Sequence, residues 1–151
     1  MYDIKTILLT TDFSETSRKA LQPALAVARK FGAKIVVVFV EEDRLPPLVV
    51  EYMAVGVEDV LTQQVDQAKE RLAEFARDHL REAENVELVV GVGTPHVEIV
   101  RVAEEKAADV IVMATHGRGF VSHAILGSTA ERVLRRAPCP VLIAREAETK
   151  G

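Results

Sequence analysis

The stretch ADVIVMATHGRGFVSHAILGSTAERV, residues 108–133, carries the pattern that decides the fold. It contains VIVMA at 110–114, an apolar run of the kind found in strands that are covered on both faces of a parallel sheet. Gly117 and Gly119 follow in a loop, and GST at 127–129 begins a helix. A strand, a glycine-bearing loop and a helix start in this order predict a βα unit of an α/β protein.

The rest of the chain repeats this alternation of strands and helices. Strands are expected at residues 4–10, 34–40, 86–90, 110–114 and 141–144, and helices from Ser14 to Gly32, from Glu58 to Ala83, from Pro95 to Lys106 and from Thr129 to Arg136. Five strands that alternate with four helices predict right-handed crossovers and one doubly wound, parallel, Rossmann-like sheet. Residues 1–146 are expected to form this single domain, with 41–56 as a long connection and 147–151 as a C-terminal tail.

Several residues predict local features of these elements. Ser14 is in the position of a helix N-cap, and Thr94 with Pro95 predicts a helix start with proline at the first position. Pro23 lies inside the first predicted helix, so we expect a kink there. His79 falls on the apolar stripe of the second helix, which favours a histidine at the edge of the core over a ligand.

The composition excludes several classes of function. The net charge is -4, and lysine and arginine are scattered along the chain, so the sequence predicts no basic patch of the kind that binds nucleic acid. The apolar runs are far shorter than the roughly 20 residues that cross a membrane. Cys139 is the single cysteine, and the start of the chain lacks the pattern of a secretory signal, so we expect a cytoplasmic protein.

The loop that ends at Gly127 has the chemistry of a phosphate site. The unpaired N–H groups of Gly127, Ser128 and Thr129 at the helix start, the helix dipole and the hydroxyls of Ser128 and Thr129 all favour an anion there. The other candidate, GVG at 91–93, fails as a dinucleotide fingerprint because His96 stands where the third glycine belongs. The lysine-containing motif of a P-loop is absent from the sequence.

A second interpretation of the same helix start needs no ligand. Ser128 to Glu131 has the form S-x-x-E of a capping box, which satisfies a helix N-terminus by itself. Spacing alone favours neither interpretation. If phosphates bind there, Glu131 adds negative charge beside them, and a divalent metal ion is expected to bridge the oxygens.

Two segments resemble a known family: ADVIVMATHGRGFVSHAILGSTAERVLRRAPCPVLIAR at 108–145 and ILLTTDFSETSRKAL at 7–21. They resemble universal stress proteins, in particular the ATP-binding branch, whose pattern is G-x-x-G, nine residues, then G-S or G-T. Gly117, Gly127 and Ser128 match this pattern, and Ala114 stands in place of its first glycine. Because Ala114 ends an apolar strand, we expect ordinary β backbone there and tolerance of alanine.

The resemblance implies an adenine nucleotide alpha hydrolase-like sheet in the order 3-2-1-4-5 and a set of site residues. In that order strands one and four are neighbours whose crossovers diverge, so a crevice lies between the loops that follow them. By the resemblance, the adenosine faces Thr10, Thr11, Asp12 and Val40, the ribose and phosphate path is lined by Met113, Ala114, His116 and Gly117, and the phosphates are held by Gly127, Ser128 and Thr129. Asp12 either accepts a ribose hydroxyl or caps the first helix. Arg118 contacts phosphates or is solvated.

The leading hypothesis is a non-catalytic ATP-binding module of a stress response or signalling pathway, with Mg²⁺ or Mn²⁺ held through the phosphates. One alternative is weak ATP hydrolysis or self-phosphorylation, although the sequence shows no obvious general base, arginine finger or lysine clamp. The other is a nucleotide-free, dimeric interaction protein of the same fold. Val141 to Ala144 would form an apolar sheet edge suited to pairing with a second copy, and the resemblance also implies homodimers.

Overall fold

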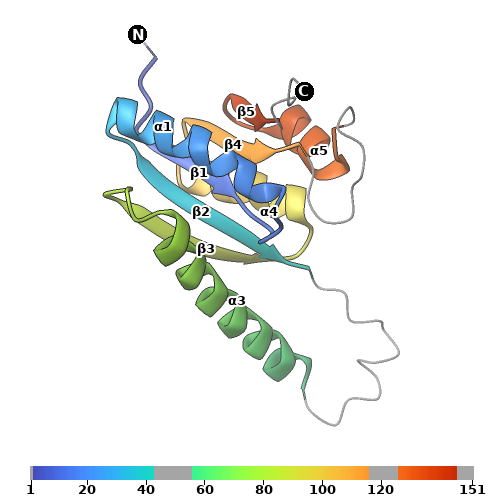
Figure 1. Ribbon diagram of the computed structural model, residues 1–151. Coiled ribbons are helices and arrows are strands. Elements are labelled where there is room, and N and C mark those ends of the chain that lie inside the picture. The colour runs from blue at the N-terminus through green and yellow to red at the C-terminus, as the bar shows by residue number, and fades with distance from the viewer. Residues whose placement is uncertain (1, 43–55, 116–125, 146–151) are drawn as a thin grey trace, which may run out of the picture.

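The computed structural model describes residues 2–42, 56–115 and 126–145 and contains the predicted parallel sheet (Figure 1). Its strands are β1 (Thr6–Thr10), β2 (Lys34–Glu41), β3 (Val86–Val92), β4 (Val110–Ala114) and β5 (Val141–Ala144). All neighbouring strands are parallel, in the order β3-β2-β1-β4-β5. The predicted order is therefore confirmed, and β1 is the central strand.

Four α-helices of the described residues cover the two faces of the sheet. They are α1 (Leu21–Phe31), α3 (Val57–His79), α4 (Pro95–Glu105) and α5 (Ser128–Arg136). Buried side chains of α1 and α3 pack on one face, and those of α4 and α5 pack on the other (Figure 1). In the part of the chain that the structure describes, no helix is both long and apolar enough to cross a membrane.

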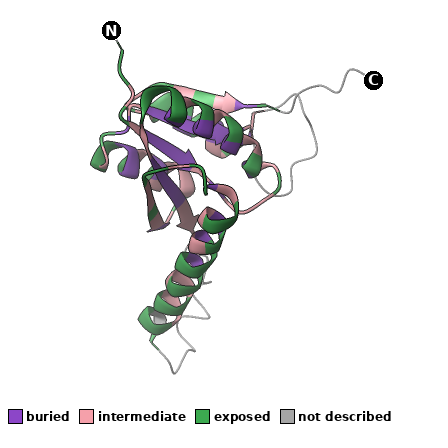
Figure 2. Ribbon diagram, turned by 60° about the vertical axis from the view of Figure 1, so that its left-hand side comes forward, coloured by how far each residue is buried: buried purple, intermediate pink, exposed green. Residues whose placement is uncertain are grey.

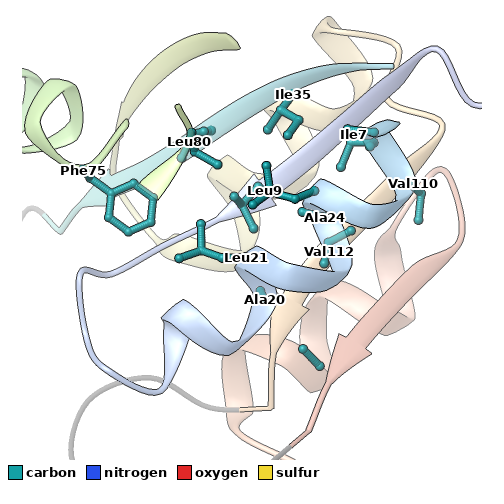
Figure 3. Packing of buried hydrophobic residues seen from close by; sticks show 14 of the residues in the cluster. Ile7, Leu9, Ala20, Leu21, Ala24, Ile35, Phe75, Leu80, Val110 and Val112 are labelled. Atoms are coloured by element: carbon teal, nitrogen blue, oxygen red, sulfur yellow. The ribbon is translucent and has the colours of Figure 1, made fainter. Parts of the chain in front are cut away.

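Alternate residues of the central strand enter two separate apolar layers. Ile7 and Leu9 of β1 belong to the layer under α1 and α3, whereas Leu8 belongs to the layer under α4 and α5. Figure 3 shows the first layer, with Leu9 close to Leu21 of α1. The three β1 residues are at most 1% exposed, and burial of each aliphatic side chain stabilises the fold by about 1.5–3 kcal/mol. Burial on both faces of β1, β2 and β4, visible as purple strands in Figure 2, explains why these strands show no polar alternation.

Strand pairing sets some boundaries that the sequence pattern does not show. β4 and β5 have the predicted bounds. β3 continues through Gly91 to Val92 because it pairs with Val40 and Glu41 at the end of a longer β2. Glycine usually indicates a turn in a sequence, but Gly91 lies inside a strand ladder.

The first helix differs most from its prediction. A short 3₁₀ helix, η1 (Ser17–Ala20), precedes α1. Pro23 therefore lies in the first turn of α1, where a backbone N–H has no intrahelical acceptor, and the prediction of a proline in the helix interior is wrong. The N-cap of η1 is Thr16, not the predicted Ser14, although the Ser14 hydroxyl accepts the N–H of Ser17, the first residue of η1, at 3.1 Å.

α3 is longer than the sheet that it covers. Its 23 residues span about 34 Å, whereas the 7 residues of β3 span about 23 Å. None of residues 58–67 is buried, and buried side chains begin at Ala68, so the amino-terminal turns extend beyond the sheet (Figures 1 and 2). The helix ends at His79, before the predicted Ala83, and the half-buried His79 ring lies 5.0 Å from that of Phe75, at the core edge as predicted.

Two helix ends have a residue with left-handed backbone, one a glycine and one an alanine, so substitutions at the two positions test how this backbone affects stability. Gly32 follows α1 with a φ of 64°, and Ala107, just after α4, has a φ of 51°. A Cβ at Gly32 would meet nothing within 4 Å, so Gly32→Ala is expected to lower the free energy of unfolding by about 1 kcal/mol through backbone strain alone. Ala107→Gly is expected to raise it by roughly 0.5 kcal/mol. Urea unfolding measures both changes, and equal stability of Gly32→Ala and the parent would contradict the left-handed helix end.

Candidate functional site

The carboxyl edge of the sheet contains a cleft of about 830 Å³. The ends of β1, β2 and β4 line it together with residues of α3, α4 and the first turn of α5. This volume lies in the usual range for small-molecule sites, about 300–1,000 Å³. β1 and β4 are neighbours, but α1 and α5, which follow them, cover opposite faces of the sheet, so the cleft lies at its topological switch point.

The cleft brings together most of the residues predicted to contact a nucleotide. Those that line it are Thr10, Thr11, Asp12, Val40, Met113, Ala114, Gly127, Ser128 and Thr129. His116, Gly117 and Arg118 lie outside the described residues. The structure therefore joins the ends of three strands and one helix start into one site.

Thr11 and Ser17 hold the turn that follows β1. Their hydroxyl oxygens are 3.2 Å apart, and the two residues are only 6% and 7% exposed. Ser17 Oγ donates its hydrogen to the carbonyl of Ser14 at 2.8 Å, so Thr11 is the donor to Ser17. Thr11 Oγ1 also accepts the N–H of Phe13 at 3.0 Å. The Thr11 hydroxyl therefore shapes the turn, and its hydrogen is used inside the protein.

The same turn fixes Asp12 and Phe13. Asp12 Oδ1 accepts the N–H of Ser14 at 2.9 Å and so forms an Asx turn; Ser14 precedes η1, so this bond is not a cap of the first helix. Phe13 has a φ of 66°, a strained value for a bulky residue. Its ring centroid lies 4.6 Å from that of Phe39 and 6.1 Å from that of Phe75. These contacts and the hydrogen bonds offset the strain and hold Asp12 at the cleft.

The start of α5 presents unpaired N–H groups to the cleft. Gly127 is the N-cap, and its own N–H donates to the carbonyl of Thr115 at 2.7 Å. The expectation that this N–H is available to a ligand is therefore wrong. No described residue accepts a hydrogen bond from the N–H of Ser128 or Thr129, the first two residues of the helix. These two groups, the helix dipole and both hydroxyls remain as donors for an anion.

The capping box predicted as the alternative for this helix start does not form. Because Gly127 is the N-cap, Ser128 lies inside the helix, and the structure has no side-chain cap there. Glu131 forms a salt bridge of 2.8 Å with Arg135 instead of turning back to the helix start. The S-x-x-E spacing is present in the sequence, but a capping box needs Ser128 at the N-cap, and α5 has its N-cap one residue earlier, at Gly127.

Ala114 has the backbone expected of it. It is the last residue of β4, pairs with Ala144 of β5 and is 6% exposed. Its φ is not positive, since Phe13 and Ala107 are the described non-glycine residues with positive φ. The position therefore needs no glycine for its backbone conformation, and only the extra methyl group distinguishes it from the family pattern.

Sequence reasoning missed the polar side chains at the α3 end of the cleft. Glu41 and Glu42 lie at the end of β2, and Gln64 and Arg71 reach the cleft from α3. The spacing of seven residues puts Gln64 and Arg71 on one helix face, but only the packing of α3 shows that this face meets the cleft. Carboxylates of Asp12, Glu41 and Glu42 outnumber Arg71, the single cation among the described residues of the lining.

His96 is placed beside the cleft but does not add positive charge to it. It follows Pro95, which lines the cleft at the start of α4. Burial lowers the pKa of His96, and the charges of Arg132 and Arg136 on α5 lower it further, so the neutral imidazole is favoured. The described residues also contain no cluster of His, Cys, Asp and Glu side chains able to hold a metal ion.

Comparison with known proteins agrees with this Rossmann-like architecture. The model of the universal stress protein family matches residues 3–145. Universal stress protein MJ0531 of Methanocaldococcus jannaschii is 32% identical over 145 residues, which cover 94% of this chain and 82% of that protein. The structure of MJ0577, from the same organism, matches with a TM-score of 0.81 at 29% identity and covers 99% of both chains.

A further solved structure is a universal stress protein in complex with cAMP. It matches with a TM-score of 0.61 at 26% identity and covers 96% of this chain and 99% of that one. The fold and the cleft thus define an α/β protein with a ligand-sized site at the sheet's switch point. The chain belongs to the universal stress protein family.

Thr11→Val tests the role of the Thr11 hydroxyl in the turn. The change leaves the N–H of Phe13 and the oxygen of Ser17 without their partner, so the free energy of unfolding should fall by about 1–3 kcal/mol. Thr10→Val is the matched control, because the Thr10 hydroxyl forms no hydrogen bond with a described residue, and it should change stability by less than about 0.5 kcal/mol. Urea unfolding compares the two variants; equal losses would argue against the buried network.

Proposed function

We propose that this protein binds an adenine nucleotide, ATP together with Mg²⁺ or Mn²⁺, in the cleft at the switch point of the sheet. The observation that carries the proposal is the pair of N–H groups at Ser128 and Thr129, which donate to no described residue and meet the same cleft as Asp12. Backbone donors at a helix start bind phosphate oxygens, and a carboxylate accepts hydrogen bonds from ribose hydroxyls. The nucleotide then lies with its phosphates at α5 and its adenosine toward β1 and β2.

The charges around the cleft support a requirement for a divalent cation. Asp12, Glu41 and Glu42 face a ligand that itself carries several negative charges, and Arg71 is the one cation of the described lining. No cluster of described side chains would hold the metal, so the phosphates are its expected ligands. ATP is therefore expected to bind more tightly with Mg²⁺ than without it.

Two observations favour a protein that binds an adenine nucleotide over an interaction protein that binds none. The capping box that would satisfy α5 without a ligand is not formed. The family member at 26% identity that was solved with cAMP holds an adenine nucleotide. We propose a nucleotide-dependent module of a stress response or signalling pathway in the cytoplasm, whose bound state is read by a partner or by its own dimer.

Replacement of Ser128 by proline tests the phosphate end of the site. Proline removes one N–H and one hydroxyl but suits the first position of a helix, and Gly127, at φ -65° and ψ 157°, has the backbone that precedes proline readily. Titration calorimetry of nucleotide-stripped protein with ATP, ADP and AMP, each with and without Mg²⁺, should show ATP affinity reduced about tenfold to a hundredfold in Ser128→Pro.

Ser128→Ala is the matched control for that experiment, because it keeps the N–H and removes only the hydroxyl. It should lose less affinity than the proline variant, while circular dichroism shows the helices intact in both. Parent protein that binds none of the nucleotides would refute the proposed function. Unchanged affinity of Ser128→Pro would place the phosphates elsewhere in the cleft.

We also propose that two copies pair through β5. Among the described residues this strand pairs with β4 alone, so its outer edge offers backbone groups that no described strand pairs with, and Leu142 on it is 37% exposed. Pairing of the same strand across a two-fold axis would satisfy the edge with a self-complementary contact.

Leu142→Lys tests this interface by light scattering on purified protein. A charge on the apolar edge should shift the dimer to monomer. Leu88→Lys is the matched control, since Leu88 is 38% exposed on β3, the opposite edge of the sheet. Loss of the dimer in Leu88→Lys but not in Leu142→Lys would assign the interface to β3 instead.

A further inference from the structure

The α3 end of the cleft contains a cation that phosphate binding does not explain. Arg71 lies there with Gln64 and the carboxylates of Glu41 and Glu42. Ser128 lies at the other end, on the helix that follows β4. β1 separates β2 from β4, so about two strand spacings of 4.8 Å lie between the two ends. Arg71 therefore faces the part of the cleft that a nucleoside would occupy.

Phe13 fixes the position of this guanidinium. The Cζ atom of Arg71 lies over the Phe13 ring, 4.3 Å from its centroid. The ring is itself held by Phe39 and Phe75, and the N–H of Phe13 is bound by Thr11. Arg71 forms no salt bridge with another described residue, so the aromatic ring is the contact that orients its side chain.

A guanidinium held over a ring on one side can receive a second flat group on the other. Nucleobases stack on arginine side chains, because the guanidinium is planar, weakly hydrated and positively charged. A lysine ammonium supplies the same charge but has no plane. The carboxylates of Glu41 and Glu42, which line the same cleft, suit the amino group of an adenine, because they accept hydrogen bonds.

We infer that Arg71 is a base-binding residue of the proposed nucleotide site: its guanidinium, seated on Phe13, stacks on the purine ring. This inference rests on the proposed function and adds the residue that binds the end of the ligand opposite the phosphates. Because the contact is to the base, it contributes equally to the binding of adenosine, AMP and ATP.

The experiment measures binding of adenosine, AMP and Mg²⁺-ATP to Arg71→Met, Arg71→Lys and Arg77→Met by titration calorimetry. Both Arg71 variants should lose about fivefold to tenfold in affinity for all three ligands, since neither retains the stacking plane. Arg77 is an exposed arginine of the same helix that does not line the cleft, so Arg77→Met should bind like the parent.

Three outcomes would overturn the inference. A loss that grows from adenosine to ATP would mean that Arg71 contacts phosphates. Full affinity of Arg71→Lys would mean that the charge acts without stacking, and full affinity of Arg71→Met would mean that there is no contact. Parent protein that binds no nucleotide overturns the proposed function as well, whereas binding by the parent and by Arg71→Met alike overturns only the inference.

Discussion

The central strand imposes the constraint on which the rest of the molecule depends. β1 is hydrogen-bonded to β2 on one side and to β4 on the other, and Ile7, Leu8 and Leu9 are covered on both faces. A strand with no open edge and no open face leaves only its ends accessible. The helices that follow β1 and β4 cover opposite faces, so the backbone separates at the carboxyl end and creates the cleft.

The two ends of the cleft offer different kinds of chemical group. At α5 the donors are backbone N–H groups whose positions are set by the helix itself. At α3 the groups are long side chains, and one of them, Arg71, lies over the Phe13 ring of an aromatic cluster. The strained turn that carries Phe13 connects them, because the hydroxyls of Thr11 and Ser17 hold it against the end of β1. The cleft thus offers fixed backbone dipoles at one end and charged side chains at the other.

The sequence predicted those features that follow from periodicity and chain direction. The alternation of strands and helices predicted the parallel sheet and the bounds of β4 and β5, whereas the strand order came from the resemblance to universal stress proteins. Given that order, the meeting of Asp12 with Ser128 at one edge follows from the diverging crossovers of strands one and four. Its errors lie where one residue decides a hydrogen bond: Gly127, not Ser128, caps α5, and a 3₁₀ turn shifts Pro23 into the first turn of α1. Arg71 was missed because periodicity alone does not identify the face that meets the cleft.

The overhang of α3 has a consequence for the dynamics of the protein. Free energies of local opening depend on buried contacts, and residues 58–67 have none that are fully buried, while Leu72 and Phe75 lie in the core. Amide protons near the amino end of α3 should therefore exchange with solvent much faster than those near its carboxyl end. Arg71 sits close to the boundary between these regions, so a stacked ligand would slow exchange in the neighbouring turns without any change in the fold.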